Sequence, residues 1–344
     1  MTYIIGEIGQ NHNGSVDICK LLVDVASRPV KDELFSKSLK QMDAVKLTKR
    51  DLSQELSSTQ MRSLYNSPHS FGKTYGEHRA FLELNDEQHF EVYKYTKSKG
   101  LDFVETLCAI GCLSMLKLFT PDKLKVASRD LTNLPLLTAL AETKIPMIIS
   151  TGMAGKKELN DAIQVITKYH NNLSILHCVS EYPTKYKNVN LNTIPYLKKQ
   201  YSNFSIGYSD HTIGISTPIA AVAMGAEIIE KHITLDRNMK GTDQKGSLSI
   251  DGIRRMVRDI RNLEKSFGEE NIMIAPSVKD AKNKLERSIA TNKNLNVGSI
   301  IKIEDLHLLS PGDGLKWVER DKIIGKELIQ NIPKDEIIYL NNLK

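Results

Sequence analysis

Residues 204–233 read F-S-I-G-Y-S-D-H-T-I-G-I-S-T-P-I-A-A-V-A-M-G-A-E-I-I-E-K-H-I, and this stretch decides the fold. Its pattern predicts a strand over Phe204–Tyr208, a helix over Thr217–Met224 and a second strand over Glu227–Lys231. A histidine follows each strand, His211 after the first and His232 after the second. The stretch therefore combines a repeating strand–helix pattern with two side chains that carry chemistry.

The two histidines predict a metal site. Each is flanked by a carboxylate, Asp210 for the first and Glu230 for the second. An imidazole at the exit of a strand, beside an acid that can orient it, is a common way to hold a divalent metal with open coordination positions. If the two strands are neighbours, both rings face one cavity, and an enzyme is the leading hypothesis. The alternative is a pair of histidines that are hydrogen-bonded within a polar core.

The same alternation extends over the first 265 or so residues and predicts a (β/α)8 TIM barrel, an α/β fold. Short apolar, β-branched runs predict eight strands: Tyr3–Glu7, Ala44–Leu47, Asp102–Glu105, Leu124–Ala127, Pro146–Ser150, Ser174–Cys178, Phe204–Tyr208 and Glu227–Lys231. Apolar residues three and four apart predict helices between them: Val16–Ala26, Asp86–Lys99, Leu134–Glu142, Lys157–His170, Thr217–Met224 and Ile250–Phe267. No glycine-rich nucleotide-binding loop follows the first strand, which argues against a dinucleotide or P-loop fold.

Polar residues gather in or just after the predicted strands, where barrel enzymes build their active sites. They are Glu7, Lys46, Thr106, Lys125, Ser128, Ser150, Thr151, Ser180, Ser209, His211, Glu230 and His232. Strand ends that meet solvent would explain the serines. They do not explain charged residues inside otherwise apolar segments, because unpaired charges are rarely buried.

Two long segments interrupt the barrel pattern, and a different texture follows it. Ser27–Met42 is a charged insertion, and Asn66–Leu84 is a glycine-containing loop of the kind that covers a site. We expect a barrel over residues 1–270, a linker over 271–285 that includes a polar helix, and a small β-rich domain over 286–344. Its predicted strands are Ser288–Ala290, Ile300–Leu306, Leu328–Ile332 and Ile337–Tyr339.

Composition narrows the class of function. The net charge of +6 is modest, and Lys and Arg form no long run, so a nucleic-acid partner is not expected, whereas an anionic substrate fits. Four scattered cysteines do not make a secreted disulfide framework. Neither a signal peptide nor a membrane-spanning apolar stretch is evident, so we expect a cytoplasmic protein without a membrane partner.

Seven spaced motifs resemble those of the sialic acid synthases. Six lie in the barrel region: I-I-G-E-I-G-Q-N-H-N-G, K-T-Y-G-E-H, K-V-A-S-R-D-L-T-N-L-P-L-L, I-S-T-G-M, G-Y-S-D-H-T and E-K-H-I-T-L-D. The tail from Glu286 to Gly314 is similar to the antifreeze-like (SAF) domain of the same enzymes. The motifs occur in the family's order over nearly the whole chain, which makes the resemblance specific.

The resemblance implies a reaction and its participants. These synthases condense phosphoenolpyruvate with an N-acetylmannosamine-type aldose, add water and release phosphate. They use Mn²⁺ or a similar ion, with Mg²⁺ and Co²⁺ as alternatives. The resemblance also implies a homodimer in which the SAF domain of one subunit reaches the barrel of the other.

The resemblance further implies a role for each matching residue. His211 and His232 would ligate the metal, and Glu7, Asp130 and Glu230 would be the catalytic carboxylates. Phosphoenolpyruvate would bind to the cations and hydroxyls of Lys46, Thr106, Lys125, Ser128, Ser150 and Ser209. The substrate-binding residues Ser180, Tyr182 and Asp243 complete the set, with Tyr182 and Asp243 on the sugar.

Departures from the family pattern leave the identity of the sugar substrate undetermined. Thr48 stands where many members have Gln, and Ser310 stands where bacterial members have an Arg that reaches the sugar amide. The sugar could therefore be free or 6-phosphorylated N-acetylmannosamine, mannose, or a diacetamido hexose that leads to legionaminate or pseudaminate. The loop residues Lys73, His78 and Arg79 are candidates for contact with a 6-phosphate.

Two hypotheses of other kinds remain. One is a barrel without catalysis that binds carbohydrate through its SAF domain. The other is an aldolase with a Schiff-base lysine at Lys125 or Lys231.

Overall fold

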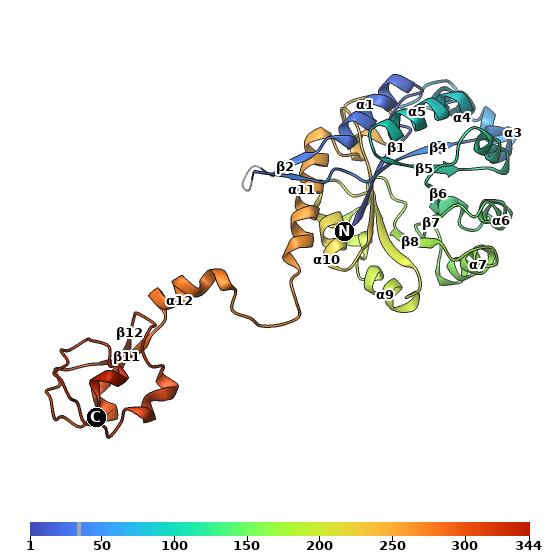
Figure 1. Ribbon diagram of the computed structural model, residues 1–344. Coiled ribbons are helices and arrows are strands. Elements are labelled where there is room, and N and C mark those ends of the chain that lie inside the picture. Colours follow the sequence, from blue (N-terminus) through green and yellow to red (C-terminus); the bar gives the residue numbers. More distant parts are fainter. Residues whose placement is uncertain (33–35) are drawn as a thin grey trace. The chain divides into compact units, whose positions relative to one another are not determined.

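The computed structural model describes residues 1–32 and 36–344 and divides the chain into two compact units, Met1–Gly268 and Glu269–Lys344 (Figure 1). Each unit has its own hydrophobic core, one over the barrel strands and helices and one around Ile289 and Ile338. Each is described by itself below.

The first unit is a closed barrel of eight parallel strands in the order β1-β10-β9-β8-β7-β6-β5-β4, which confirms the predicted fold class. The strands are β1 (Tyr3–Gly9), β4 (Ala44–Lys49), β5 (Asp102–Leu107), β6 (Lys123–Val126), β7 (Met147–Ser150), β8 (Leu173–Cys178), β9 (Ser205–Asp210) and β10 (Ile228–His232). All eight strands predicted from the apolar runs are present. The barrel closes because β1 pairs with both β10 and β4.

Amphipathic helices surround the strands, as Figure 1 shows. They are α1 (Val16–Ser27), α5 (Asp86–Ser98), α6 (Leu134–Glu142), α7 (Lys156–Ile166), α9 (Thr193–Gln200), α10 (Ser216–Ala223) and α11 (Ile250–Ser266). Six of them match the predicted helices, with ends that differ by at most four residues. The pattern missed α9, because only Ile194 and Leu197 of this short helix are buried and the apolar spacing is correspondingly weak.

Pleating separates each strand into residues that face the barrel interior and residues that face the helices. In β9 and β10 the register pairs Ser209 with Glu230 and Asp210 with Lys231. Gly207 lies where β8, β9 and β10 approach closely: a Cβ on this residue would come within 2.5 Å of the Ile228 carbonyl oxygen and the Leu176 side chain. A larger side chain would therefore force apart the two strands that carry the histidines.

Both predicted interruptions have structure of their own. Ser27–Met42 contains the antiparallel pair β2 (Val30–Asp32) and β3 (Lys37–Leu39), and its residues 33–35 lie outside the described part of the chain. Three short helices follow β4: α2 (Leu52–Glu55), α3 (Ser58–Arg62) and α4 (Tyr75–Leu82). Thr74 and Glu77 form a capping box that fixes the start of α4.

Shorter helical segments follow several strands. They are η1 (Ile110–Lys117), η2 (Ser128–Asp130), α8 (Tyr186–Val189) and η3 (Gln244–Gly246). The 3₁₀ segment η2 follows β6 after Ala127 alone and directs the side chains of Ser128, Arg129 and Asp130 in different directions.

The second unit begins with η4 (Pro276–Val278) and α12 (Lys279–Leu285), within the segment predicted as a linker. Its regular strands are β11 (Ser288–Thr291) and β12 (Leu306–Leu309), an antiparallel pair. Short helical turns complete it: η5 (Ile303–Asp305), η6 (Trp317–Lys322) and η7 (Leu340–Asn342).

Three strands predicted for this unit are corrected by the structure. The strand predicted at Ile300–Leu306 is wrong, because residues 303–305 form η5 and pairing starts at Leu306. Leu328–Ile332 and Ile337–Tyr339 make only single bridges, such as Leu295 with Ile332 and Ala290 with Ile337. A unit with so small a core holds its chain through isolated bridges and turns more than through continuous ladders.

Among the described residues, no helix has both the length and the apolar content that crossing a bilayer would require.

Candidate active site

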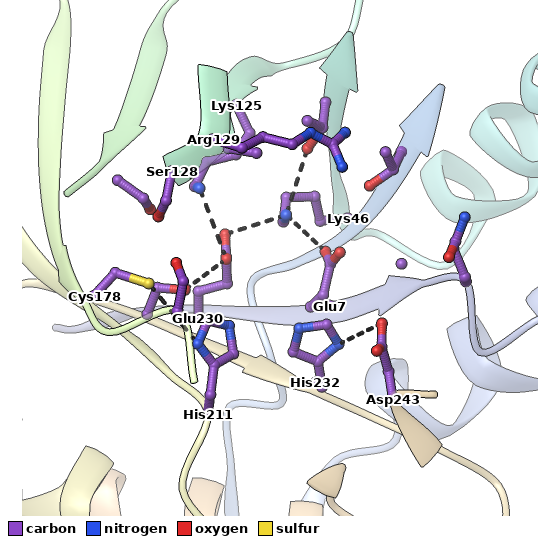
Figure 2. A pocket seen from close by; sticks show the side chains of 18 of the residues that line it. Glu7, Lys46, Lys125, Ser128, Arg129, Cys178, His211, Glu230, His232 and Asp243 are labelled. Atoms are coloured by element: carbon purple, nitrogen blue, oxygen red, sulfur yellow. Dashed lines mark hydrogen bonds and ion pairs between the residues drawn. The ribbon is translucent and has the colours of Figure 1, made fainter. Parts of the chain in front are cut away.

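A cavity of about 430 Å³ opens among the carboxyl ends of the barrel strands, as Figure 2 shows. Every predicted site residue except Asp130 lines it. They are Glu7, Lys46, Thr106, Lys125, Ser128, Ser150, Ser180, Tyr182, Ser209, His211, Glu230, His232 and Asp243. The barrel closure thus brings together side chains from almost the whole length of the first unit.

Two carboxylates and two ammonium groups form the floor of the cavity. Lys46 Nζ lies 2.9 Å from Glu7 Oε2 and 3.6 Å from Glu230 Oε2, and Lys125 Nζ lies 3.9 Å from Glu230 Oε1 (Figure 2). Ser209 Oγ donates to Glu230 Oε1 at 2.9 Å. All four charged side chains are buried, so each compensates the desolvation of another.

The two carboxylates differ in acidity. Burial raises the pKa of Glu7 to about 7, although the ammonium group of Lys46 opposes the shift. Burial acts in the same direction on Glu230, but Lys125 and Lys46 together outweigh it and lower the pKa of Glu230. Burial also lowers the pKa of Lys125. At neutral pH the floor therefore holds one ionised carboxylate and one carboxyl group close to its midpoint.

The two histidines share the wall beside this floor. Their ring centroids are 5.5 Å apart, and the ring of Tyr182 lies 4.0 Å from that of His211 and 6.0 Å from that of His232. His211 Nδ1 donates to the carbonyl oxygen of Val179 at 2.9 Å, which leaves Nε2 as the nitrogen with a lone pair. The prediction that the two rings face one cavity is confirmed.

The prediction that Asp210 and Glu230 orient these histidines is wrong. Asp210 points to the helix side of the barrel, where it is paired with Lys231 Nζ at 2.5 Å. Glu230 faces inward but contacts Ser209 and the two lysines. The reason is pleating: residue 210 and residue 211 lie on opposite faces of β9, so an acid directly before an inward histidine points outward. The polar contacts of His211 are instead the Val179 carbonyl oxygen and, at 3.8 Å, Cys178 Sγ. That of His232 is Asp243 Oδ2, at 4.0 Å from His232 Nδ1.

The pair of histidines is compatible with a divalent ion. His232 Nδ1 is buried without a hydrogen-bond partner, and burial lowers the pKa of this side chain so that the ring is neutral near pH 7. Within residues 1–32 and 36–344 no group of three or more His, Cys, Asp or Glu side chains is placed to hold a metal. An ion here would therefore take two imidazoles from the protein and leave positions for substrate or water.

The third predicted carboxylate is placed elsewhere. Asp130 lines a second cavity of about 320 Å³ beside the first, and Arg129 Nε lies 3.2 Å from Asp130 Oδ2. Arg129, one residue earlier, lines both cavities. The turn of η2 between Ser128 and Asp130 explains why only Arg129 reaches the main cavity, because adjacent residues of a 3₁₀ turn project roughly 120° apart.

Sequence reasoning assigned no role to several residues of the cavity wall. Gln10, Arg50, Arg129, Met153, Cys178 and Thr242 are among them. A signal for two of these was present: Arg50 and Arg129 each follow a predicted cavity lysine by four residues, Lys46 and Lys125 respectively. Inward-facing positions recur every two residues along a strand, so the pattern could have been extended past the strand ends.

Lys231, one of the two lysines proposed to form a Schiff base, does not reach this cavity. Lys231 is fully buried on the helix side of β10, where it forms an ion pair with Asp210. Lys125 does line the cavity and remains the candidate for that hypothesis.

Comparison with known proteins identifies the family. Residues 37–272 match the model of the NeuB family, and residues 286–344 match the SAF domain. The chain belongs to the NeuB family. The resemblance to sialic acid synthases seen in the sequence is thereby confirmed.

Several relatives of this NeuB family member are named synthases. N-acetylneuraminate-9-phosphate synthase of Drosophila melanogaster is 31% identical over 99% of this chain and 95% of its own length. N,N'-diacetyllegionaminic acid synthase of Legionella pneumophila is 33% identical over 96% of this chain and 91% of its own. The crystal structure of N-acetylneuraminic acid synthetase from Leptospira borgpetersenii, in complex with citrate, superposes with a TM-score of 0.66 at 30% identity, over 81% of this chain and 90% of that one. The chain is therefore a nonulosonate synthase homologue and an enzyme of this family.

Proposed function

We propose that this protein condenses phosphoenolpyruvate with an N-acetylmannosamine-type aldose. A carbon–carbon bond forms between C3 of phosphoenolpyruvate and the aldehyde carbon of the sugar. Water adds at C2, and inorganic phosphate leaves. The observation that carries the proposal is the meeting of Glu7, Glu230, Lys46, Lys125 and the histidine pair in one cavity.

The cations on the floor suit the phosphate and carboxylate of phosphoenolpyruvate. Lys46 and Lys125 supply ammonium groups, and hydroxyls of Thr106, Ser128 and Ser150 line the same cavity. Lys46 Nζ lies 3.4 Å from Thr106 Oγ1, so the ammonium group and the hydroxyl can contact the same anion. Charge-assisted hydrogen bonds of this kind bind an anion more strongly than neutral ones.

Glu230 and Glu7 have different roles in the later steps of the proposed reaction. Glu230, ionised beside two ammonium groups, is suited to stabilise positive charge that develops at C2. Glu7, with a pKa of about 7, can take a proton from water at neutral pH and return one later. Asp130 has no role in this scheme, because it lines the neighbouring cavity.

His211 and His232 are the residues that would hold a divalent ion, with Mn²⁺ proposed and Mg²⁺ or Co²⁺ as alternatives. When bound, such an ion polarises a carbonyl oxygen as a Lewis acid. Tyr182, whose ring lies 4.0 Å from that of His211, and Asp243 would position the sugar there.

A phosphate-release assay tests the proposal. Release is expected only when phosphoenolpyruvate, an aldose and Mn²⁺ are all present, and mass analysis should show a product larger by three carbons than the aldose. Glu7→Gln is expected to lower kcat by about 10²- to 10⁴-fold, because it removes the proton acceptor but keeps the shape. Sugar binding that persists without metal and without turnover would instead support a non-catalytic carbohydrate-binding protein. Trapping of a substrate adduct by borohydride would support the Schiff-base alternative.

A second sugar is favoured by one position in the cavity wall. Thr48 lines the cavity where a longer amide is common, which leaves more room beside the sugar. The same chemistry on mannose or on a diacetamido hexose therefore remains the second candidate. The Legionella relative is named for N,N'-diacetyllegionaminic acid. A panel of aldoses in the same assay separates these candidates by kcat/KM.

We also propose that the working enzyme is a homodimer, as the family resemblance implies. The second unit carries Ser310 in place of an arginine, so its contribution to sugar binding would be weaker than in relatives with that arginine. Sedimentation at several protein concentrations tests this proposal, and a monomer that turns over substrate at the full rate would refute it.

A further inference from the structure

Three arginines line both the active-site cavity and the second cavity beside it, so they form the wall between the two. They are Arg50, Arg79 and Arg129. Arg50 follows Lys46 by four residues and Arg129 follows Lys125 by four. Arg50 lies just past the carboxyl end of β4, and Arg129 lies in η2, just past the carboxyl end of β6. These arginines therefore form a layer outside the ammonium layer on the cavity floor.

The charges in this outer layer are not all compensated. Arg50 Nη1 lies 2.9 Å from Glu55 Oε2, and Arg129 is 3.2 Å from Asp130 and 3.5 Å from Glu55. Among residues 1–32 and 36–344, no carboxylate forms an ion pair with Arg79. The cavity therefore has a guanidinium group without a counter-ion at its outer end.

Arg79 is nevertheless held firmly in place. Its Nε and Nη2 donate to the hydroxyl of Tyr75 at 2.9 and 2.7 Å, and Nη1 donates to Gln10 Oε1 at 2.5 Å. These bonds use three of the five N–H donors of a guanidinium group and leave two. A cation that is pre-positioned by neutral acceptors and still has free donors is suited to bind an anion.

We propose that Arg79, assisted by Arg129, binds a phosphate group on the sugar substrate, at the end remote from the aldehyde. This inference rests on the proposed function, because it takes the aldehyde to lie at the histidine pair. The phosphate of phosphoenolpyruvate is assigned to Lys46 and Lys125, so the outer layer is free for a second anion. A phosphate monoester fits better than a carboxylate, because it offers more acceptor oxygens to two guanidinium groups.

The test compares N-acetylmannosamine with its 6-phosphate, each with saturating phosphoenolpyruvate and Mn²⁺. The phosphorylated sugar is expected to have the higher kcat/KM, and Arg79→Gln to reduce its advantage over the free sugar by on the order of 10- to 100-fold. Arg79→Lys should restore part of the advantage, because it keeps the charge. N-acetylmannosaminuronate, tested in parallel, distinguishes phosphate from carboxylate recognition.

Two control variants separate anion binding from a structural role. Tyr75→Phe removes hydrogen bonds to Arg79 but keeps the charge of Arg79. If the only role of Arg79 is to hold Tyr75 in place, Arg79→Gln and Tyr75→Phe should reduce the kcat/KM advantage of the phosphorylated sugar equally. Arg255→Gln removes a charge from an exposed ion pair with Asp251 and should not change the ratio. Equal kcat/KM for the two sugars in the wild type, or an equal loss for both sugars in Arg79→Gln, would overturn the inference.

A failure of the proposed function gives a different result. If no aldose is turned over, calorimetric titration in the presence of phosphoenolpyruvate still decides the question. Binding of the 6-phosphate that weakens in Arg79→Gln supports the subsite, and equal binding of free and phosphorylated sugar refutes it.

Discussion

Single residues in this barrel owe their chemistry to their immediate neighbours. Glu7 and Glu230 are both buried carboxylates, yet their pKa values move in opposite directions because Glu230 lies near two ammonium groups and Glu7 lies beside one. Lys46 is the residue that connects them, at 2.9 Å from Glu7 and 3.6 Å from Glu230. The acidity of both carboxylates on the cavity floor therefore depends strongly on Lys46.

Lys46→Met is expected to destabilise the protein by about 3 kcal/mol and to raise KM for phosphoenolpyruvate at least tenfold. The stability loss arises because two buried carboxylates are left with Lys125 alone. Urea denaturation and substrate titration measure the two effects. Lys157→Met is the matched control: Lys157 is exposed and pairs with Asp161 on the surface, so its loss should change stability by less than about 0.5 kcal/mol. Equal effects of the two variants would contradict the assigned role.

Glu83 predicts a pH dependence of stability. Burial raises its pKa from 4.5 to about 7, although Arg50 opposes the shift. The folded protein thus binds this proton more tightly than the unfolded chain, so the contribution to stability is fully present below pH 4.5 and is lost as the pH rises to about 7. Glu83→Gln should therefore gain stability relative to the wild type between pH 5 and pH 8, by about 1–3 kcal/mol. A difference that stays constant with pH in urea denaturation would rule this out.

At the scale of elements, β9 and β10 set the position of the histidine pair. Their inward faces carry Ser209, His211, Glu230 and His232, and their outward faces are joined by the ion pair of Asp210 and Lys231. Asp210 also accepts from Tyr208 Oη at 2.8 Å and from the Thr212 amide at 2.9 Å. This buried cluster holds the ends of two neighbouring strands at the point where the histidines begin.

Lys231→Met is expected to cost about 3–5 kcal/mol, since it leaves Asp210 buried without its cation. Retained Mn²⁺ affinity per folded molecule would show that the cluster serves stability alone, whereas a weaker affinity would show that it also sets the spacing of His211 and His232. Calorimetric metal titration and urea denaturation measure these quantities. Asp251→Asn, which breaks only exposed ion pairs on α11, should stay within about 1 kcal/mol of the wild type.

At the scale of the whole molecule, the chain consists of two units with separate hydrophobic clusters. Every residue that lines the active-site cavity comes from the first unit. The floor, the histidine pair and the arginine wall are all made of barrel residues.

A fragment of residues 1–268 is expected to fold and to unfold cooperatively, with a Tm within roughly 4 °C of the barrel transition in the full chain. The reason is that no barrel core residue is removed, and about 1 kcal/mol shifts Tm by only 2–4 °C in a domain of this size. Differential scanning calorimetry provides the measurement. A fragment that is unfolded at 25 °C would show that the first unit depends on the second.

How much of this the sequence predicted differs between strands and turns. The eight strands and many of the cavity residues followed from apolar runs and from the polar residues at their ends, because both are properties of consecutive residues. Tyr182 and Asp243 followed only from the family resemblance. The strand predicted at Ile300–Leu306 failed, because in a small unit isolated bridges and turns replace continuous pairing. That Arg129 and not Asp130 lines the main cavity could not be predicted either, because it depends on the direction of a single 3₁₀ turn.

The sequence by itself determined the barrel, the family and most of the residues at the carboxyl ends of the strands. The alternation of strand and helix patterns and the order of the motifs are properties of the sequence alone. Only the tertiary structure decided which side chains meet: that Lys46 bridges two carboxylates, that Asp210 faces Lys231 and not His211, and that three arginines share one wall. These contacts join residues from different strands. They arise when the barrel closes, because closure fixes register and pleat and so determines which face of each strand a side chain occupies.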